Sequence, residues 1–363
     1  MLREMPKIRA LSRPRRSRVL SQVPRVVLEP LSRDCCGAQL NDMSNPYESA
    51  YSSAALEALT EHFDLGADLY KFWGSPSSVL RALTRGWAHA DHPSHLHYAW
   101  DLETAPSLDH AILETTRQAI AALDLRGVEA PRLFEPGCGI GGGVNQVAAM
   151  LPHAQVTGLS LVERQLEIGR SMARARKLSN TEFVQGNYLS TAFPDASFDG
   201  IFAIETQVYT PIAEKPALCR EMFRLLKPGR MFVCFDGFRP RDAVDEQERA
   251  WVQDVLDGWT MPMPATPQEF KEAGRSAGFE IMRAENATRH IYASARRIAA
   301  IATSVLLPLS AVPSIPLLGG LVKPLGFQSP QHARRFVNAC RSQLRVFDAG
   351  LGAYYVYVFR KPV

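Results

Sequence analysis

The sequence predicts an α/β protein with a doubly wound, Rossmann-like sheet of seven strands, an N-terminal helical cap and a C-terminal hydrophobic lid insert. Short apolar runs alternate with segments of helical period, and the first run ends in a glycine-rich turn at 137–143. An uncharged stretch of 25 residues, 298–322, interrupts the end of this pattern. Strands that alternate with helices form a parallel sheet, whose ligand sites lie beyond the carboxyl ends of its strands.

The glycine-rich turn is the strongest single signal. Residues 131–134 supply a buried strand, and glycines follow at alternate positions, where a Cβ would collide with a closely bound ligand. The helix at 144–150 then directs its N-terminal dipole toward that ligand. A glycine turn alone is weak evidence, because dinucleotide enzymes use a similar one.

The other elements follow in order. An amphipathic helix follows the second strand and continues to about Lys177, and a later helix runs from the N-cap Thr266, with Pro267 in its first turn, to Gly278. The remaining six strands are expected at 155–159, 182–185, 198–204, 231–235, 279–282 and 353–359.

Composition fits an enzyme with a full core, since 46% of the 363 residues are hydrophobic. The net charge of +4 misleads, because residues 1–33 carry nine Lys or Arg against two acids. These residues carry a net charge of +7, so the net charge of the rest of the chain is −3. The rest of the chain therefore has no excess of basic residues that would indicate nucleic-acid binding. A homo-oligomer is compatible with this composition.

Residues 1–42 are rich in Arg, Ser and Pro and lack a helical period, so we expect a disordered basic tail. It is either an organellar transit peptide or an upstream extension with Met43 as the functional start. The chain lacks the apolar core of a secretory signal, and its six cysteines include no CxxC pair. Both features favour a reduced, cytoplasmic protein.

The spacing Glu-x-Gly-x-Gly-x-Gly at the turn resembles motif I of class I S-adenosylmethionine (SAM) methyltransferases. The order of the elements over about 60–240 resembles the branch that methylates sterols, tocopherols, fatty acids and prenyl diphosphates. The resemblance implies that SAM is the cofactor and that its methionine part lies against Glu135, Gly137, Gly139 and Gly141.

The same resemblance implies further cofactor contacts after the second and third strands. Ser160, Leu161 and Gln165 match a Gly-Leu-Thr-Leu-Ser-x-x-Gln element of the sterol and cyclopropane enzymes. Asn187 stands where the usual Asp receives the adenine amino group, and Tyr188 follows it. Ser160 and Asn187 also suit simple turns, and that interpretation stays open.

Aromatic residues concentrate ahead of the sheet. The segment 68–74 resembles the Asp-x-Tyr-x-x-x-Trp-Gly run of sterol and natural-product methyltransferases, and 95–98 resembles their His-Leu-His-Phe element. We therefore expect Tyr70, His97 and Tyr98 in the site, where aromatic faces attract a sulfonium or carbocation by roughly 0.5–2 kcal/mol each. Histidines at 89, 92, 95 and 97 lack the partners of a zinc site, so no metal is expected there.

Glu205, directly after the fourth strand, is the predicted base. Residues 205–209 resemble the Glu-Ser-Thr-Met-Tyr element of geranyl diphosphate C-methyltransferases, and no histidine stands where O-methyltransferases of this group carry one. A carboxylate walled by apolar residues has a raised pKa suited to accepting a proton. The alternative is that Glu205 only orders the SAM amino group or a neighbouring loop.

Five segments are expected: the tail at 1–42, a helical cap at 43–125, the SAM-binding core at 126–285, a hydrophobic lid at 286–346 and the last strand at 347–363. Prolines within 298–322 leave no apolar run near the ~20 residues that span a bilayer, so this stretch is a lid or a peripheral membrane contact.

The predicted reaction is C-methylation of a hydrophobic isoprenoid, above all geranyl or farnesyl diphosphate, through a carbocation. Mg²⁺ would be required if the substrate is a diphosphate. Sterol C-methylation, O-methylation of a polyketide or lipid hydroxyl, and a SAM-fold protein without catalysis are the alternatives.

Overall fold

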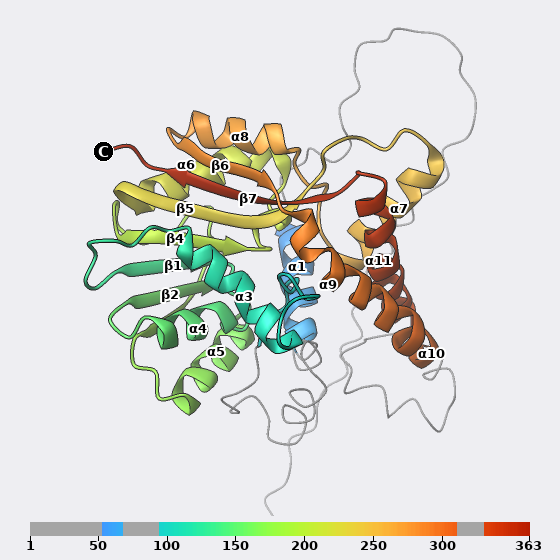
Figure 1. The fold of residues 1–363 in the computed structure, drawn as a ribbon, viewed down its shortest axis with the longest axis horizontal. Helices are drawn as coiled ribbons and strands as arrows, with labels where there is room; N and C mark the ends of the chain where they lie inside the picture. Colours follow the sequence, from blue (N-terminus) through green and yellow to red (C-terminus); the bar gives the residue numbers. More distant parts are fainter. Residues whose placement is uncertain (1–52, 68–93, 311–329) are drawn as a thin grey trace, which may run out of the picture. The chain divides into compact units, whose positions relative to one another are not determined.

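A computed structural model describes residues 53–67, 94–310 and 330–363 (Figure 1). All of them belong to the compact unit Asn45–Val363. The predicted tail at 1–42, the segment at 68–74 with Tyr70, and part of the expected lid, 311–329, lie outside the described residues.

The structure confirms the predicted seven-stranded α/β sheet. Its strand order is β3-β2-β1-β4-β5-β7-β6, and β7 alone runs antiparallel to its neighbours. The strands are β1 (Arg132–Pro136), β2 (Gln155–Ser160), β3 (Thr181–Gln185), β4 (Phe198–Ile204), β5 (Leu226–Phe238), β6 (Glu280–Asn286) and β7 (Ala353–Arg360).

Helices cover both faces of the sheet (Figure 1). The described helices are α1 (Ser53–Gly66), α3 (Leu108–Ala121), α4 (Gly142–Met150), α5 (Glu163–Ala175), α6 (Lys215–Leu225), α7 (Glu246–Trp259), α8 (Pro267–Ser276), α9 (Thr288–Ile301), α10 (Leu307–Ser310) and α11 (Pro330–Asp348). Short turns of helix lie at Gln207–Tyr209, Ile212–Glu214 and Ala302–Leu306. Apolar residues of α3, α4 and α5 form the core on one face, and those of α6 and α8 form it on the other.

Local sequence signals explain where several elements begin and end. Thr266 accepts a hydrogen bond from the Glu269 N–H while the Glu269 carboxylate accepts one from the Thr266 N–H, so α8 begins with the expected cap and Pro267. β6 extends past the predicted residue 282 to Asn286, although its side chains are mostly exposed. Backbone pairing with β7 maintains this edge strand, and an apolar pattern does not mark such pairing.

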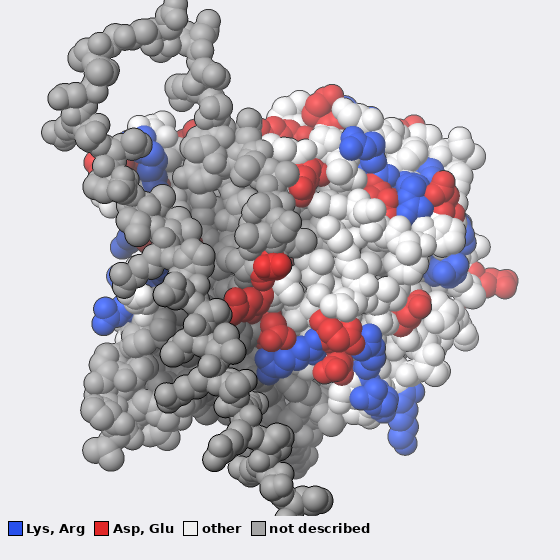
Figure 2. Space-filling view, turned by 180° about the vertical axis from the view of Figure 1, so that it is seen from behind, with Lys and Arg blue, Asp and Glu red and all other residues white. Residues whose placement is uncertain are grey.

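Helices α7, α9, α10 and α11 gather beyond the carboxyl ends of β4 and β5 (Figure 1). Residues of α9 and α11 bury a small apolar cluster against Tyr98 and Trp259. Across the described part of the chain, no helix is both long and apolar enough to cross a membrane. On the face shown in Figure 2, described basic and acidic side chains are interspersed.

Candidate active site

Two neighbouring cavities open at the carboxyl ends of the central strands. The first, which we call the glycine-turn cavity, lies between the turn at 137–143, the end of β2 and α1. The second, which we call the apolar cavity, lies between β5, β7 and the helices α7, α9 and α11. Leu96, His97, Glu205 and Tyr209 line both cavities, so the two spaces share one wall.

The glycine turn has the conformation that its sequence predicts. Gly137, Gly139 and Gly141 have φ values of 68°, 52° and 77°, a region that side chains disfavour. A Cβ on Gly137 would lie 2.2 Å from Thr206 Cγ2, and one on Gly141 would lie 2.4 Å from the Phe183 ring. Gly137 and Gly139 line the cavity, whereas Gly141 serves the packing behind it.

Glu135 places a buried carboxyl group in the glycine-turn cavity. Burial raises its pKa to about 8, and a hydrogen bond from the Val144 N–H opposes that rise. Its Oε2 atom is buried and has no hydrogen-bond partner among the described residues. An unused carboxyl oxygen beside a glycine turn suits a ligand with an ammonium group, so the residues present fit the amino-acid part of SAM.

The residues after β2 form a connected group on the same cavity wall. Ser160 Oγ donates a hydrogen bond to Gln165 Oε1 at 2.9 Å and accepts one from the Val162 N–H at 3.1 Å. Ser160, Leu161 and Gln165 all line the cavity. The structure therefore brings these three predicted cofactor residues together, while Ser160 also stabilises the turn.

Of the two predicted cofactor residues after β3, one lines the cavity and the other does not. Tyr188 lines the cavity, and its hydroxyl lies 3.0 Å from Thr210 Oγ1. Asn187 is absent from the cavity lining, and its Oδ1 accepts a hydrogen bond from the Leu189 N–H at 2.9 Å. In this arrangement the Asn187 side chain forms a turn, and its role toward adenine stays a prediction.

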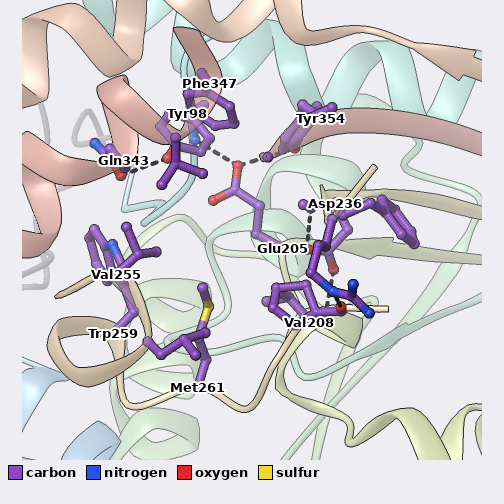
Figure 3. A pocket seen from close by; sticks show the side chains of 18 of the residues that line it. Tyr98, Glu205, Val208, Asp236, Val255, Trp259, Met261, Gln343, Phe347 and Tyr354 are labelled. Carbon is purple, nitrogen blue, oxygen red and sulfur yellow. Dashed lines mark hydrogen bonds between the residues drawn. The ribbon is translucent and has the colours of Figure 1, made fainter. Parts of the chain in front are cut away.

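The walls of the apolar cavity are mostly aliphatic and aromatic (Figure 3). They include Val255, Trp259 and Met261 from α7 and the residues after it, and Phe347 from α11. Among the described lining residues, Arg239 is the only Lys or Arg, and its guanidinium already pairs with Asp242. A hydrophobic ligand with few charges suits these walls.

Glu205 faces this apolar cavity from the shared wall. Its Oε1 atom accepts hydrogen bonds from the Tyr98 N–H at 2.8 Å and the Tyr354 hydroxyl at 3.1 Å. Figure 3 shows its other carboxyl oxygen turned away from Tyr354. Burial raises the pKa of Glu205 to about 8, and the charge of Asp236 adds to the rise.

The structure places two of the three predicted cap residues beside Glu205. The Tyr98 hydroxyl donates to Gln343 Oε1 at 2.8 Å, and burial raises the pKa of Tyr98 well above its usual value. His97 Nδ1 bonds the Tyr98 carbonyl oxygen at 3.0 Å. Because a carbonyl only accepts, the Nδ1 atom carries the proton. Burial lowers the His97 pKa to about 4, which makes the ring neutral at pH 7.

Three site residues were missed by the sequence reasoning: Asp236, Gln343 and Tyr354. Asp236 directly follows the predicted fifth strand, as Glu205 follows the fourth, so the same strand-end rule could have found it. Tyr354 begins the last strand among other tyrosines, and nothing local distinguishes it. Gln343 contacts Tyr98 across 245 residues of sequence, and no local signal marks that contact.

No group of three metal-ligating side chains occurs within residues 53–67, 94–310 and 330–363. The His95 and His97 rings lie 4.9 Å apart. His89 and His92 lie outside the described residues.

Residues 134–229 match the family model of the methyltransferase domain. The matched stretch includes the glycine turn, and the match agrees with the methyltransferase fold that the turn and the strand order predict.

Two curated relatives are sterol enzymes. Cycloartenol-C-24-methyltransferase 1 of Oryza sativa subsp. japonica is 28% identical over 243 residues, which are 65% of this chain and 62% of the relative. Sterol 24-C-methyltransferase ERG6A of Gibberella zeae is 31% identical over 195 residues, which are 53% of this chain and 44% of the relative. The matches thus span less than two thirds of either relative.

Solved structures share the fold at low identity. The [4+2]-cyclase SpnF aligns with a TM-score of 0.62 and 21% identity over 84% of this chain and 95% of its own. A geranyl diphosphate methyltransferase in complex with GPP and sinefungin aligns with a TM-score of 0.61 and 15% identity, over 85% of this chain and 100% of its own. The cyclopropane synthase MmaA2 from Mycobacterium tuberculosis aligns with a TM-score of 0.64 and 15% identity, over 84% of this chain and 97% of its own.

Proposed function

We propose that this protein transfers a methyl group from SAM to an alkene carbon of a hydrophobic isoprenoid, with Glu205 as the base. The observation that carries the proposal is the position of Glu205 on the wall shared by the two cavities. One cavity suits SAM and the other suits a greasy substrate. A carboxyl group between them can reach a substrate carbon close to the methyl donor.

The residues of the chain divide the chemistry between them. SAM, when bound, supplies an electrophilic methyl group. Glu135 would hold its ammonium group, and the glycine turn would let the backbone approach it closely. The alkene π electrons of the substrate would form the new C–C bond as the S–CH₃ bond breaks, which leaves neutral S-adenosylhomocysteine and a carbocation on the neighbouring substrate carbon. Glu205 then accepts a proton from the adjacent carbon, and the C–H electrons restore the double bond.

Aromatic faces beside Glu205 suit such a cation. The rings of Tyr98 and Tyr354 lie edge to face with centroids 6.0 Å apart, and Trp259 lines the same cavity. A ring face stabilises a desolvated cation by about 2 kcal/mol. Water would capture a carbocation, so apolar walls also protect the intermediate.

The substrate class divides into two candidates. The resemblance of residues 205–209 favours geranyl or farnesyl diphosphate, and four structural neighbours are named for geranyl diphosphate. The names of the curated relatives favour a sterol. Within the described part of the cavity, Arg239 is the only Lys or Arg, and a diphosphate requires several cations or Mg²⁺. The described walls therefore favour the uncharged isoprenoid.

O-methylation of a lipid or polyketide hydroxyl is the second candidate, because His97 also lines both cavities. Its lowered pKa of about 4 makes it a weaker base than Glu205.

The proposal is tested with radiolabelled SAM and four substrates: geranyl diphosphate, farnesyl diphosphate, a sterol and a hydroxylated polyketide, each with and without Mg²⁺. We expect label on carbon in an isoprenoid product. A product that carries its label as a methoxy group would replace the proposal with O-methylation, and a requirement for Mg²⁺ would favour the diphosphate.

A further inference from the structure

The turn after β4 presents Glu205 to both cavities, and we call residues 205–210 the strand-four turn. Glu205 has a φ of 50°, which costs a non-glycine residue energy unless its surroundings hold it there. Its N–H donates to the Phe235 carbonyl oxygen at 2.8 Å, which fixes only the start of the turn. Other contacts must therefore hold the rest of it.

Asp236 holds the backbone amides of the turn. Its Oδ2 atom accepts hydrogen bonds from the Thr206 N–H at 2.9 Å and the Val208 N–H at 3.2 Å. Its Oδ1 atom accepts one from the Gly237 N–H at 2.7 Å. Asp236 is only 1% exposed, so solvent cannot take the place of its carboxylate as the acceptor for these amides.

Lys215 holds the same turn through Gln207. Its Nζ atom donates to the backbone oxygen and the side-chain oxygen of Gln207. The ammonium group lies 6.0 Å from the centre of the Phe270 ring, and the residue is 1% exposed.

This lysine is placed at a cost to stability. Burial of an ammonium group is unfavourable and lowers the Lys215 pKa to about 8, while the negative charge of Asp236 opposes that fall. Lys215 is also the first residue of α6, where the helix dipole disfavours a positive charge. A methionine would avoid both costs, but it would leave Gln207 without this donor and the buried Asp236 carboxylate without this cation.

The turn also contacts the glycine turn. Thr206 Oγ1 lies 3.2 Å from the Gly137 carbonyl oxygen, and its methyl group occupies the space where a Gly137 Cβ would be. Movement of residues 206–208 would therefore disturb both cavities at once.

We propose that Lys215 and Asp236 are positioning residues, which clamp the strand-four turn at Thr206, Gln207 and Val208 and so aim the Glu205 carboxyl group. This inference rests on the proposed function for its effect on catalysis, whereas the clamp itself is a property of the fold. Neither residue is assigned to a step of the reaction.

Lys215→Met tests the clamp, because it keeps the length of the side chain and removes the charge and the donors. Lys227→Met is the matched control: Lys227 pairs with Asp199 at 2.8 Å, at the opposite end of β4 from Glu205. We expect hydrogen exchange in the peptide that covers 204–209 to accelerate roughly 5- to 10-fold in Lys215→Met and to stay unchanged in the control.

Catalysis gives the second measurement. A base displaced by a fraction of an ångström to 1 Å loses up to roughly 10²-fold in rate, so kcat should fall by that order in Lys215→Met while the substrate KM changes little. If exchange and kcat both match the wild type, the clamp is refuted. If the wild type methylates none of the four substrates, the proposed function fails, but the exchange measurement still decides the clamp.

Asp236→Asn keeps the shape and provides a test if Lys215→Met does not fold. Exchange at 204–209 should again accelerate, since a neutral amide oxygen accepts more weakly than a carboxylate. The charge of Asp236 also raises the pKa of Glu205, so the rise of kcat with pH should move to lower pH. A purely structural role would leave that profile in place, and an unmoved profile with unchanged exchange would overturn the proposal.

Discussion

The carboxyl group of Glu205 is buried, yet one of its two oxygens faces the apolar cavity. Both of its described hydrogen bonds end on Oε1, and the second oxygen faces the cavity (Figure 3). Desolvation raises its pKa to about 8, which matches the carboxyl group to proton transfer near neutral pH.

Glu205→Gln should still bind SAM but lower turnover by roughly 10²–10⁴-fold, because the amide keeps the shape but cannot accept the proton. Calorimetric titration with SAM and the labelled-methyl assay measure the two quantities. His97→Gln is the companion variant, and it should be the less damaging of the two. Normal turnover in Glu205→Gln, together with its loss in His97→Gln, would assign the base to His97.

Tyr354→Phe should move the rise of kcat with pH to higher values. The Tyr354 hydroxyl donates to Glu205 Oε1, a bond that favours the ionised carboxylate and lowers its pKa. Without that bond the pKa rises further above its usual value, so the active ionised form requires a higher pH. Tyr355→Phe is the control, since neighbouring strand residues point to opposite faces. An unshifted profile in Tyr354→Phe would show that this bond does not tune the base.

At the scale of elements, the turn between β1 and α4 and the turn after β4 form one unit. Thr206 packs against Gly137, and Asp236 at the end of β5 holds the backbone beside it. Three neighbouring strands thus contribute their carboxyl ends to one wall. Helices α7, α9 and α11, packed beyond those ends, close the second cavity over it.

Gly139→Val should abolish SAM binding while the protein remains folded. Gly139 lines the glycine-turn cavity at a φ of 52°, where a branched side chain would both strain the backbone and enter the cofactor space. Gly127→Val imposes the same change at a φ of 74° with no heavy atom within 4 Å, so it controls for backbone strain. Calorimetry of both variants, with circular dichroism for the fold, checks the prediction. Equal SAM affinity in the two variants would disprove the cofactor assignment of this cavity.

At the scale of the whole molecule, SAM binding should release protons. Burial raises the pKa values of Glu135 and Glu205 to about 8, so both carboxyl groups hold a proton at pH 7 in the ligand-free protein. The apolar cavity that Glu205 faces is also lined by His97, Tyr98, Tyr209, Asp236 and Tyr354. Among these groups, Asp236 is ionised at pH 7 because its pKa is about 6. A cationic ligand between the two glutamates would lower both pKa values.

Calorimetric titration at pH 7 in buffers of different ionisation enthalpy counts the released protons. We expect a net release with SAM, less with S-adenosylhomocysteine, whose sulfur is neutral, and a smaller release for SAM in Glu135→Gln. Equal release with both ligands would show that the sulfonium charge does not act on these glutamates.

Much of this protein was determined by local sequence. The alternation of apolar runs and helical segments predicts the sheet, because burial on both faces requires that pattern. Glycines at alternate positions predict the turn around a ligand, and an acid directly after a strand predicts Glu205 at the cavity edge. The carboxyl ends of β5 and β6 were less predictable, since pairing with β7 extends the two strands to Phe238 and Asn286.

Only the tertiary structure decided what surrounds Glu205. Tyr354 meets it across 149 residues, Gln343 meets Tyr98 across 245, and Asp236 reaches the turn from a neighbouring strand. A tyrosine in a strand or a lysine at a helix start has the same local signal whether it lies in the core or at a site. Contacts between distant elements follow from how those elements pack, and packing depends on the whole set of buried surfaces rather than on the period of any one segment.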